Sequence, residues 1–276
     1  MTASPTLSAH GAAIPALGFG TSPMTGGLAP DTVVTALKAG YRHIDTAWKY
    51  GTERAVGEAM RASGVPRGEI FLTTKVSHEN LRSDAFAKSV DESLAALRVD
   101  DVDLLMVHWP NPDQGRFSDA VRGLAALLDE GSIKAIGVSN FKPAHLRQVI
   151  EETGVTPDVN QIQLSPYSTR DTSRAFDSEH GIVTESWSPI GGSGDDLRSD
   201  PAVVGLGEKY GKSATQVVLR WHIQLGLVAI PKSGNPGRIA ENLAIFDFEL
   251  TADEMATRPS CTCQRSTIWV ADLPYF

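Results

Sequence analysis

The chain has 276 residues, which suffice for one large domain, and a barrel of eight strand–helix units needs about 250 residues. Its formal net charge of −8 argues against a general nucleic-acid-binding surface. The two cysteines give no disulfide framework, no signal peptide is visible, and the apolar runs fall short of the roughly 20 residues of a membrane helix. We therefore expect a soluble, cytoplasmic protein that binds neither nucleic acid nor membranes.

Short apolar runs alternate with longer segments of helical period through most of the chain. The predicted strands, in chain order, are residues 16–20, 42–45, 70–75, 102–108, 133–139, 159–163, 182–186 and 227–230. The predicted helices that follow them are residues 30–39, 53–63, 83–97, 118–129, 143–152, 170–180, 213–224 and 235–243.

This alternation predicts a parallel sheet, because repeated strand–helix–strand units place parallel strands side by side. Eight units that close on themselves form a (β/α)8 TIM barrel of the α/β class. An open doubly wound sheet has the same alternation, but it favours a G-x-G-x-x-G turn after its first strand. Gly18 and Gly20 are present and the third glycine is missing. We therefore predict one barrel domain over residues 1–276, with a short N-terminal cap and a C-terminal loop over the barrel mouth.

Motifs for other chemistries are incomplete. Gly211, Lys212 and Ser213 resemble the end of a phosphate-binding P-loop, but Leu206 stands where that motif needs its first glycine. The seven histidines are scattered along the chain, so no metal site is expected.

Four chemically active side chains are expected at adjacent strand ends. Asp45 ends the second predicted strand and Tyr50 follows it, Lys75 ends the third strand, and His108 ends the fourth. Because catalytic groups of such barrels lie at the C-terminal ends of the strands, these side chains should meet at one mouth. Alone, His108 is more often a core histidine and Lys75 a structural ion-pair partner. Their occurrence at consecutive strand ends favours a catalytic site.

The residue types indicate carbonyl chemistry. A tyrosine pKa near ~10 is high for a proton donor at neutral pH, and the ammonium of Lys75 lowers it. Asp45 keeps Lys75 charged in a buried place, and a neutral His108 holds a carbonyl oxygen by a hydrogen bond. Such a site supplies neither a nucleophile nor a metal. It needs a hydride donor, which a nicotinamide cofactor provides.

Six motifs together resemble the aldo-keto reductase superfamily, and most of all its bacterial 2,5-diketo-D-gluconate reductase-like members. The resemblance runs in order and at family spacing from about Ala12 to about Glu254. The motifs are HIDTAWKYG at residues 43–51, TTK at 73–75, VHWP at 107–110, GVSNF at 137–141, NQ at 160–161 and IPKS at 230–233.

The resemblance implies an NADPH-dependent oxidoreductase that reduces aldehydes or ketones to alcohols. It implies that Asp45, Tyr50, Lys75 and His108 are the catalytic tetrad, with Tyr50 as the general acid.

The resemblance also assigns residues to the cofactor. The residues implied at the nicotinamide end are Ser139, Asn140, Gln161 and the stacking Trp187. Those implied along the pyrophosphate are Ser188 and the glycine-rich residues 191–194. Those implied at the adenosine end are Lys232, Ser233 and Arg238 around the 2′-phosphate, with Glu241 and Asn242 at the adenine.

The substrate pocket implied by the resemblance contains Trp48, Ser77 and Trp109. After Lys75 the chain reads Val76 and Ser77, where many relatives carry a bulky tryptophan, so the pocket is expected to be more open. Residues 257–276 differ from the family's C-terminal tail, which borders the substrate pocket.

Two other functions fit the same fold. One is a non-catalytic, NADPH-binding regulatory barrel, against which the intact tetrad argues. The other is a Schiff-base aldolase, which needs a neutral Lys75 and is opposed by Asp45. We therefore expect an enzyme that acts on a small-molecule carbonyl substrate, and a monomer, because acidic monomers are common in the family.

Overall fold

The structure is a computed structural model that describes residues 4–9, 11–22, 30–191 and 197–257. Eight strands form one parallel sheet, and each pairs with the next strand along the chain. The predicted parallel sheet of eight strands is confirmed. Its strands are β3 Phe19–Gly20, β4 His43–Asp45, β5 Phe71–Val76, β6 Val102–Val107, β7 Ile133–Ser139, β8 Val159–Gln163, β9 Val183–Trp187 and β10 Val228–Ala229.

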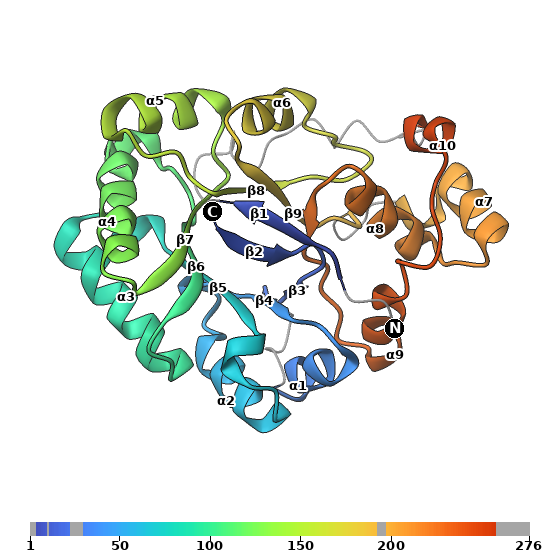
Figure 1. Cartoon of the computed structure of the whole chain (residues 1–276), viewed down its shortest axis with the longest axis horizontal. Helices are drawn as coiled ribbons and strands as arrows, with labels where there is room; N and C mark the ends of the chain where they lie inside the picture. Colours follow the sequence, from blue (N-terminus) through green and yellow to red (C-terminus); the bar gives the residue numbers. More distant parts are fainter. Residues whose placement is uncertain (1–3, 10, 23–29, 192–196, 258–276) are drawn as a thin grey trace.

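Helices surround this sheet in a ring (Figure 1). The predicted helices are confirmed, and their ends shift by at most one residue. They are α1 Pro30–Ala39, α2 Glu53–Ser63, α3 Ser83–Leu97, α4 Phe117–Asp129, α5 Pro143–Thr153, α6 Asp171–Glu179, α8 Ala214–Gln224 and α9 Pro236–Leu243.

The first and last strands of the sheet lie next to each other. The backbone N–H of Gly18 donates to the carbonyl of Ala229 at 2.9 Å, and that of Ala229 donates to the carbonyl of Ala16 at 2.9 Å. Leu17 and Ala229 form a parallel bridge. The sheet therefore curls until its two edges are in hydrogen-bonding contact, which is the arrangement that a barrel requires.

Strand β6 shows why the central strands are apolar throughout. Leu105 and Val107 belong to the apolar cluster between the sheet and the helices, whereas Leu104 and Met106 belong to a second cluster on the inner face. Successive side chains of a strand point to opposite faces, and both faces of this sheet are covered. Polar side chains near the ends of such strands are therefore exceptions that need a functional reason.

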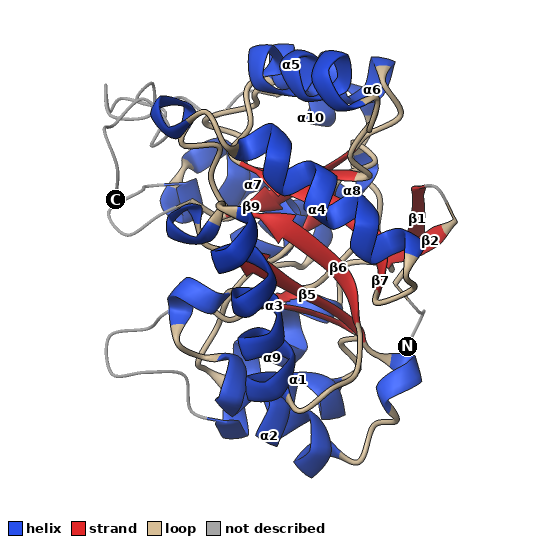
Figure 2. Cartoon of the chain, turned by 90° about the vertical axis from the view of Figure 1, so that its left-hand side faces the viewer, coloured by secondary structure: helices blue, strands red, loops and turns tan. Residues whose placement is uncertain are grey.

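Two strands and two α-helices were not predicted. Strands β1 Thr6–Ala9 and β2 Ala12–Pro15 form an antiparallel hairpin that lies across the centre of the ring (Figure 1). Figure 2 places this hairpin at the end of the sheet from which β6 starts, so it covers the N-terminal end. Helices α7 Pro201–Tyr210 and α10 Ala252–Ala256 were also missed. Two glycines weaken the helical signal of α7, and α10 is short.

No helix among the residues that the structure describes is long and apolar enough to cross a membrane. The expected C-terminal loop over the mouth falls mainly within residues 258–276, outside the described residues.

Two helical glycines give a test of the packing between α2 and α3. A Cβ atom added to Gly57 in α2 would overlap the backbone carbonyl oxygen of Leu97 at the end of α3, whereas one added to Gly205 in α7 meets nothing within 4 Å. We predict that Gly57→Ala lowers the free energy of unfolding by roughly 1–3 kcal/mol, since backbone must move. Gly205→Ala should raise it by about 0.5–1 kcal/mol. Urea unfolding measures both, and equal effects of the two substitutions would contradict the close contact.

Candidate active site

Four side chains of the candidate site come from three consecutive strand ends. Asp45 is the last residue of β4, and Tyr50 ends the short 3-10 helix Trp48–Tyr50 that follows it. Lys75 is the second-last residue of β5, and His108 follows β6 directly. The structure therefore brings together the four residues that the sequence placed at one mouth.

Lys75 and Asp45 form a buried ion pair. The Lys75 Nζ donates to Asp45 Oδ1 at 2.8 Å, to Asp45 Oδ2 at 2.6 Å and to the carbonyl of Thr46 at 2.9 Å. Burial is the largest single effect and lowers the pKa of Lys75, but the Asp45 carboxylate, together with Tyr50 and Glu185, outweighs burial and holds the pKa above its usual value. Lys75 is therefore a charged ammonium at neutral pH.

Tyr50 lies between Lys75 and His108. The Lys75 Nζ is 5.3 Å from the centre of the Tyr50 ring, and the rings of Tyr50 and His108 pack edge to face with centres 5.4 Å apart. Burial raises the pKa of the Tyr50 hydroxyl, while Lys75 lowers it by a smaller amount. Lys75 thus acts in the predicted direction, but burial dominates in this state and the hydroxyl keeps its proton.

His108 is neutral. Burial, followed by the charge of Lys75, holds the pKa of its imidazole well below the usual value. A neutral imidazole has one N–H to donate, which is what the sequence analysis expected of a group that holds a carbonyl oxygen.

A set of polar side chains borders this centre on β7, β8 and β9. The Asn140 amide nitrogen donates to the carbonyl of His108 at 3.1 Å and to the Ser139 hydroxyl at 3.0 Å. The Trp187 indole N–H donates to Asn140 Oδ1 at 2.9 Å. The Gln161 amide nitrogen donates to Asp45 Oδ2 at 2.8 Å. The Ser139 hydroxyl donates to the backbone carbonyl of Gln161 at 3.0 Å, so the four residues predicted at the nicotinamide end are linked to one another and, through Gln161, to the ion pair.

Glu185 is a buried acid of this site that the sequence analysis missed. Its Oε1 accepts a hydrogen bond from the Gln161 amide nitrogen at 2.6 Å, and its side chain is fully buried. Burial and the nearby Asp45 carboxylate raise the pKa of Glu185, against the opposing effect of Lys75. The available signal was an acidic residue in the middle of a strand that should be covered on both faces.

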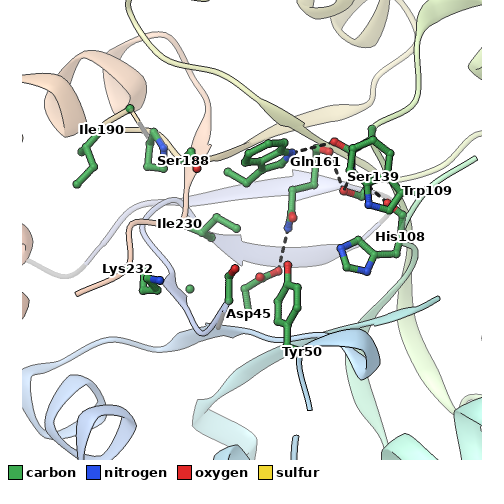
Figure 3. Close-up of a pocket in the computed structure, with 16 residues that line it drawn as sticks. Asp45, Tyr50, His108, Trp109, Ser139, Gln161, Ser188, Ile190, Ile230 and Lys232 are labelled. Atoms are coloured by element: carbon green, nitrogen blue, oxygen red, sulfur yellow. Dashed lines mark hydrogen bonds between the residues drawn. The ribbon is translucent and has the colours of Figure 1, made fainter. Parts of the chain in front are cut away.

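A cavity of about 420 Å³ lies beside Tyr50 and His108 (Figure 3). Predicted residues that line it are Asp45, Tyr50, His108, Trp109, Ser139, Asn140, Gln161, Trp187, Ser188, Gly191 and Lys232. Lys75 lies behind this lining and is fully buried. The predicted centre is therefore open to a ligand on the side of Tyr50 and His108.

A second cavity of about 440 Å³ adjoins the first, since Lys232 and Ile190 line both. Its lining contains the residues predicted at the adenosine end, which are Lys232, Ser233, Arg238, Glu241 and Asn242. Arg238 lies in α9 and is exposed to solvent. Together the two cavities extend from the buried ion pair to an exposed basic rim.

Two residues of the predicted substrate pocket do not line the first cavity. The Trp48 indole N–H donates to Glu92 Oε2 at 3.3 Å. Ser77 is fully buried, and its hydroxyl accepts from the backbone N–H of Glu79 at 3.4 Å. Only Trp109 of the three lines the cavity in the described part of the chain. Of the predicted glycine-rich stretch 191–194, only Gly191 is described.

Among the described residues, no group of three or more His, Cys, Asp or Glu side chains is placed to hold a metal ion.

Residues 16–262 match the model of the family described as the aldo/keto reductase family. The chain is 43% identical over 256 residues to 2,5-diketo-D-gluconic acid reductase B of a Corynebacterium species, covering 92% of this chain and 91% of that protein. It is 42% identical over 245 residues to methylglyoxal reductase DkgA of Salmonella typhimurium, covering 89% of this chain and 88% of that protein. The chain belongs to the aldo/keto reductase family.

Solved structures agree with this assignment. An aldo/keto reductase from Brucella melitensis superposes with a TM-score of 0.87 at 44% identity, covering 92% of this chain and 97% of that one. A Gox0644 variant solved in complex with NADPH superposes with a TM-score of 0.86 at 40% identity, covering 92% of each chain.

The buried ion pair leads to a stability prediction. Asp45→Asn leaves the Lys75 ammonium buried without its carboxylate, and breaking a buried pair in this way costs roughly 3–5 kcal/mol of unfolding free energy. We expect the double variant Asp45→Asn, Lys75→Met to recover much of that loss, because no charge is then stranded. Urea unfolding of both variants and the wild type measures the difference. A double variant no more stable than the single one would show that the cost does not arise from the unpaired charge.

Proposed function

We propose that this chain is an NADPH-dependent enzyme that reduces small aldehydes or ketones to alcohols, on a (β/α)8 barrel, with Tyr50 as the general acid. The observation that carries the proposal is the buried Lys75–Asp45 pair directly beside Tyr50, which faces a cavity together with His108. NADPH supplies a hydride to the carbonyl carbon. The protein must then hold the carbonyl oxygen and give it a proton.

Tyr50 and His108 are the groups that reach the carbonyl oxygen in this proposal. As negative charge builds on that oxygen, the Tyr50 hydroxyl donates its proton to it, and the Lys75 ammonium stabilises the phenolate left behind. Because burial keeps the pKa of Tyr50 high, the proton stays on the phenol until that charge develops. The neutral His108 donates a hydrogen bond to the same oxygen and so orients the substrate.

The polar residues of the two cavities fit a dinucleotide phosphate. Asn140 and Gln161 present amides, and the half-buried Trp187 presents a ring surface, at the end nearest Tyr50. Lys232 and Arg238 present positive charge at the far end, where a 2′-phosphate distinguishes NADPH from NADH. The NADPH complex of the Gox0644 variant, which is 40% identical to this chain, supports NADPH as the ligand.

The substrate class rests on the relatives and on the cavity. Two relatives are named for the reduction of methylglyoxal and of 2,5-diketo-D-gluconic acid. A first cavity of about 420 Å³, which the nicotinamide end must share, favours small carbonyl compounds. We propose Trp109 as a wall of the substrate pocket, with Trp48 and Ser77 as more distant candidates.

A reductase assay tests the general acid. We predict that Tyr50→Phe lowers kcat for NADPH oxidation with methylglyoxal by about 100-fold or more, while the Kd for NADPH stays nearly unchanged, because the hydroxyl acts as charge develops in the transition state. Lys75→Met should lower kcat similarly. Tyr41→Phe is a matched control, since the Tyr41 hydroxyl is buried without a partner among the described residues and lies outside both cavities. Full activity of Tyr50→Phe would exclude Tyr50 as the acid.

Equilibrium dialysis tests the cofactor preference. Arg238→Ala removes a charged hydrogen-bond donor from the 2′-phosphate, so we expect the Kd for NADPH to rise by about tenfold or more. NADH lacks that phosphate, so its Kd should change little. Arg54→Ala, which removes an exposed arginine from α2, controls for net charge. If Arg238→Ala weakened the binding of NADH as much as that of NADPH, Arg238 would not recognise the 2′-phosphate.

A further inference from the structure

Gln161 donates to two carboxyl groups at once. Its single amide nitrogen has two hydrogens, and the two acceptors are Asp45 Oδ2 at 2.8 Å and Glu185 Oε1 at 2.6 Å. Both hydrogens are therefore used inside the protein. The amide atom left for a ligand is the carbonyl oxygen, and Gln161 is part of the lining of the first cavity (Figure 3).

The two carboxyl groups are not equivalent. Asp45 is paired with the ammonium of Lys75, whereas Glu185 has no ion pair among the described residues. Glu185 Oε2 is buried and has no hydrogen-bond partner among those residues. An ionised carboxylate with a buried, unpartnered oxygen is costly, and the cost falls when that oxygen carries a proton.

We propose that Glu185 is a positioning residue that fixes the Gln161 amide for the nicotinamide end of the cofactor, and that Glu185 does so as a neutral carboxylic acid. The inference rests on the proposed NADPH-dependent function. Asp45 and Glu185 together hold the Gln161 amide in one orientation. A rotated amide would leave at least one Gln161 hydrogen unpaired, or it would turn the amide oxygen toward the Asp45 carboxylate.

The charge state of Glu185 also bears on Tyr50. The titratable groups around Glu185 are Asp45, Lys75 and Tyr50. Its direct strand partners are Gln161 on β8 and Val228 on β10, and neither titrates. Ionisation of Glu185 would add negative charge, which raises the pKa of Tyr50 and makes it a weaker acid. Since burial raises the pKa of Glu185, the ionisation is expected only on the alkaline side of the pH range.

Two substitutions distinguish the role of Glu185 as a hydrogen-bond acceptor from the effect of its charge. Glu185→Leu removes the acceptor, whereas Glu185→Gln keeps a carbonyl acceptor and is neutral at every pH. Asp177→Asn is a control for the loss of a buried carboxyl, because Asp177 lies in α6 and accepts hydrogen bonds from Asn160 and Thr184 instead.

Binding is measured by calorimetry at neutral pH with NADPH and with 2′-phospho-ADP-ribose, which lacks the nicotinamide. We expect Glu185→Leu to raise the Kd for NADPH by about three- to tenfold, as for the loss of one hydrogen bond, without changing the Kd for 2′-phospho-ADP-ribose. Glu185→Gln and Asp177→Asn should keep the wild-type ratio of the two constants. In a Gln161→Ala background, Glu185→Leu should have no further effect on NADPH. An unchanged NADPH constant in Glu185→Leu, or equal weakening of both ligands, overturns the positioning role.

The neutral state is tested with Glu185→Gln, which also serves if Glu185→Leu does not fold. Difference infrared spectra should show a protonated carboxyl band at neutral pH that is absent from Glu185→Gln. The alkaline fall of kcat in the wild type should move to higher pH in this variant. An unchanged carboxyl band or an unchanged alkaline limb overturns the inference. A wild type that binds neither NADPH nor 2′-phospho-ADP-ribose would instead refute the proposed function.

Discussion

The ion pair between Lys75 and Asp45 is the contact on which the centre of this molecule depends. Moving two charges out of water costs several kcal/mol for each ion, and their attraction repays that cost only when the remaining hydrogen-bonding capacity is satisfied. Here the Lys75 ammonium has three oxygen acceptors, two on Asp45 and one on Thr46. Asp45 also accepts from Gln161, across the interior of the sheet. The pair therefore constrains β4, β5 and β8 to one arrangement at their C-terminal ends.

Burial around this pair influences which groups of the site carry a proton. The same loss of hydration raises the pKa of Tyr50 and of Glu185 and lowers that of His108. Burial also acts on Lys75, but the Asp45 carboxylate, together with Tyr50 and Glu185, offsets it, so Lys75 stays charged. Burial therefore favours the neutral forms of Tyr50, His108 and Glu185 around the Lys75–Asp45 pair. Of Tyr50, His108 and Glu185, the first two line the cavity and can therefore give a proton directly to a carbonyl oxygen there.

The sequence predicted the fold well because the fold depends on periodicity. Strands covered on both faces, such as β6, are continuous apolar runs, and the amphipathic helices between them end at recognisable glycines such as Gly64. The hairpin β1–β2 lacks such a pattern, and its position over the end of the sheet follows from tertiary packing of residues such as Ile14.

The candidate site was predictable only in part. Asp45, Lys75 and His108 stood out because a polar residue at the end of a buried strand is unusual, and one fold rule brought their strand ends together. The cofactor residues came from the family resemblance, since no elementary rule assigns a role to an asparagine or a serine. Glu185 was missed because its significance lies in the shared amide of Gln161, a contact that exists only after β8 and β9 are paired.

The charged groups of the two adjoining cavities differ in their exposure to water. In the proposed function, this difference separates cofactor binding from proton transfer. Charges at the exposed rim near Arg238 act through a screened, high-dielectric medium, so contacts there add binding energy that ionic strength reduces. The groups around Lys75 are shielded from solvent, so salt acts on them weakly. Interactions far from the reacting atoms can hold a substrate or cofactor without changing the chemical step, whereas contacts that strengthen in the transition state raise kcat. On this view the exposed basic rim determines which cofactor binds, and the buried centre determines how fast the proton is transferred. In this proposal the Gln161 amide, which donates to Asp45 and to Glu185, connects cofactor binding with the buried centre that transfers the proton.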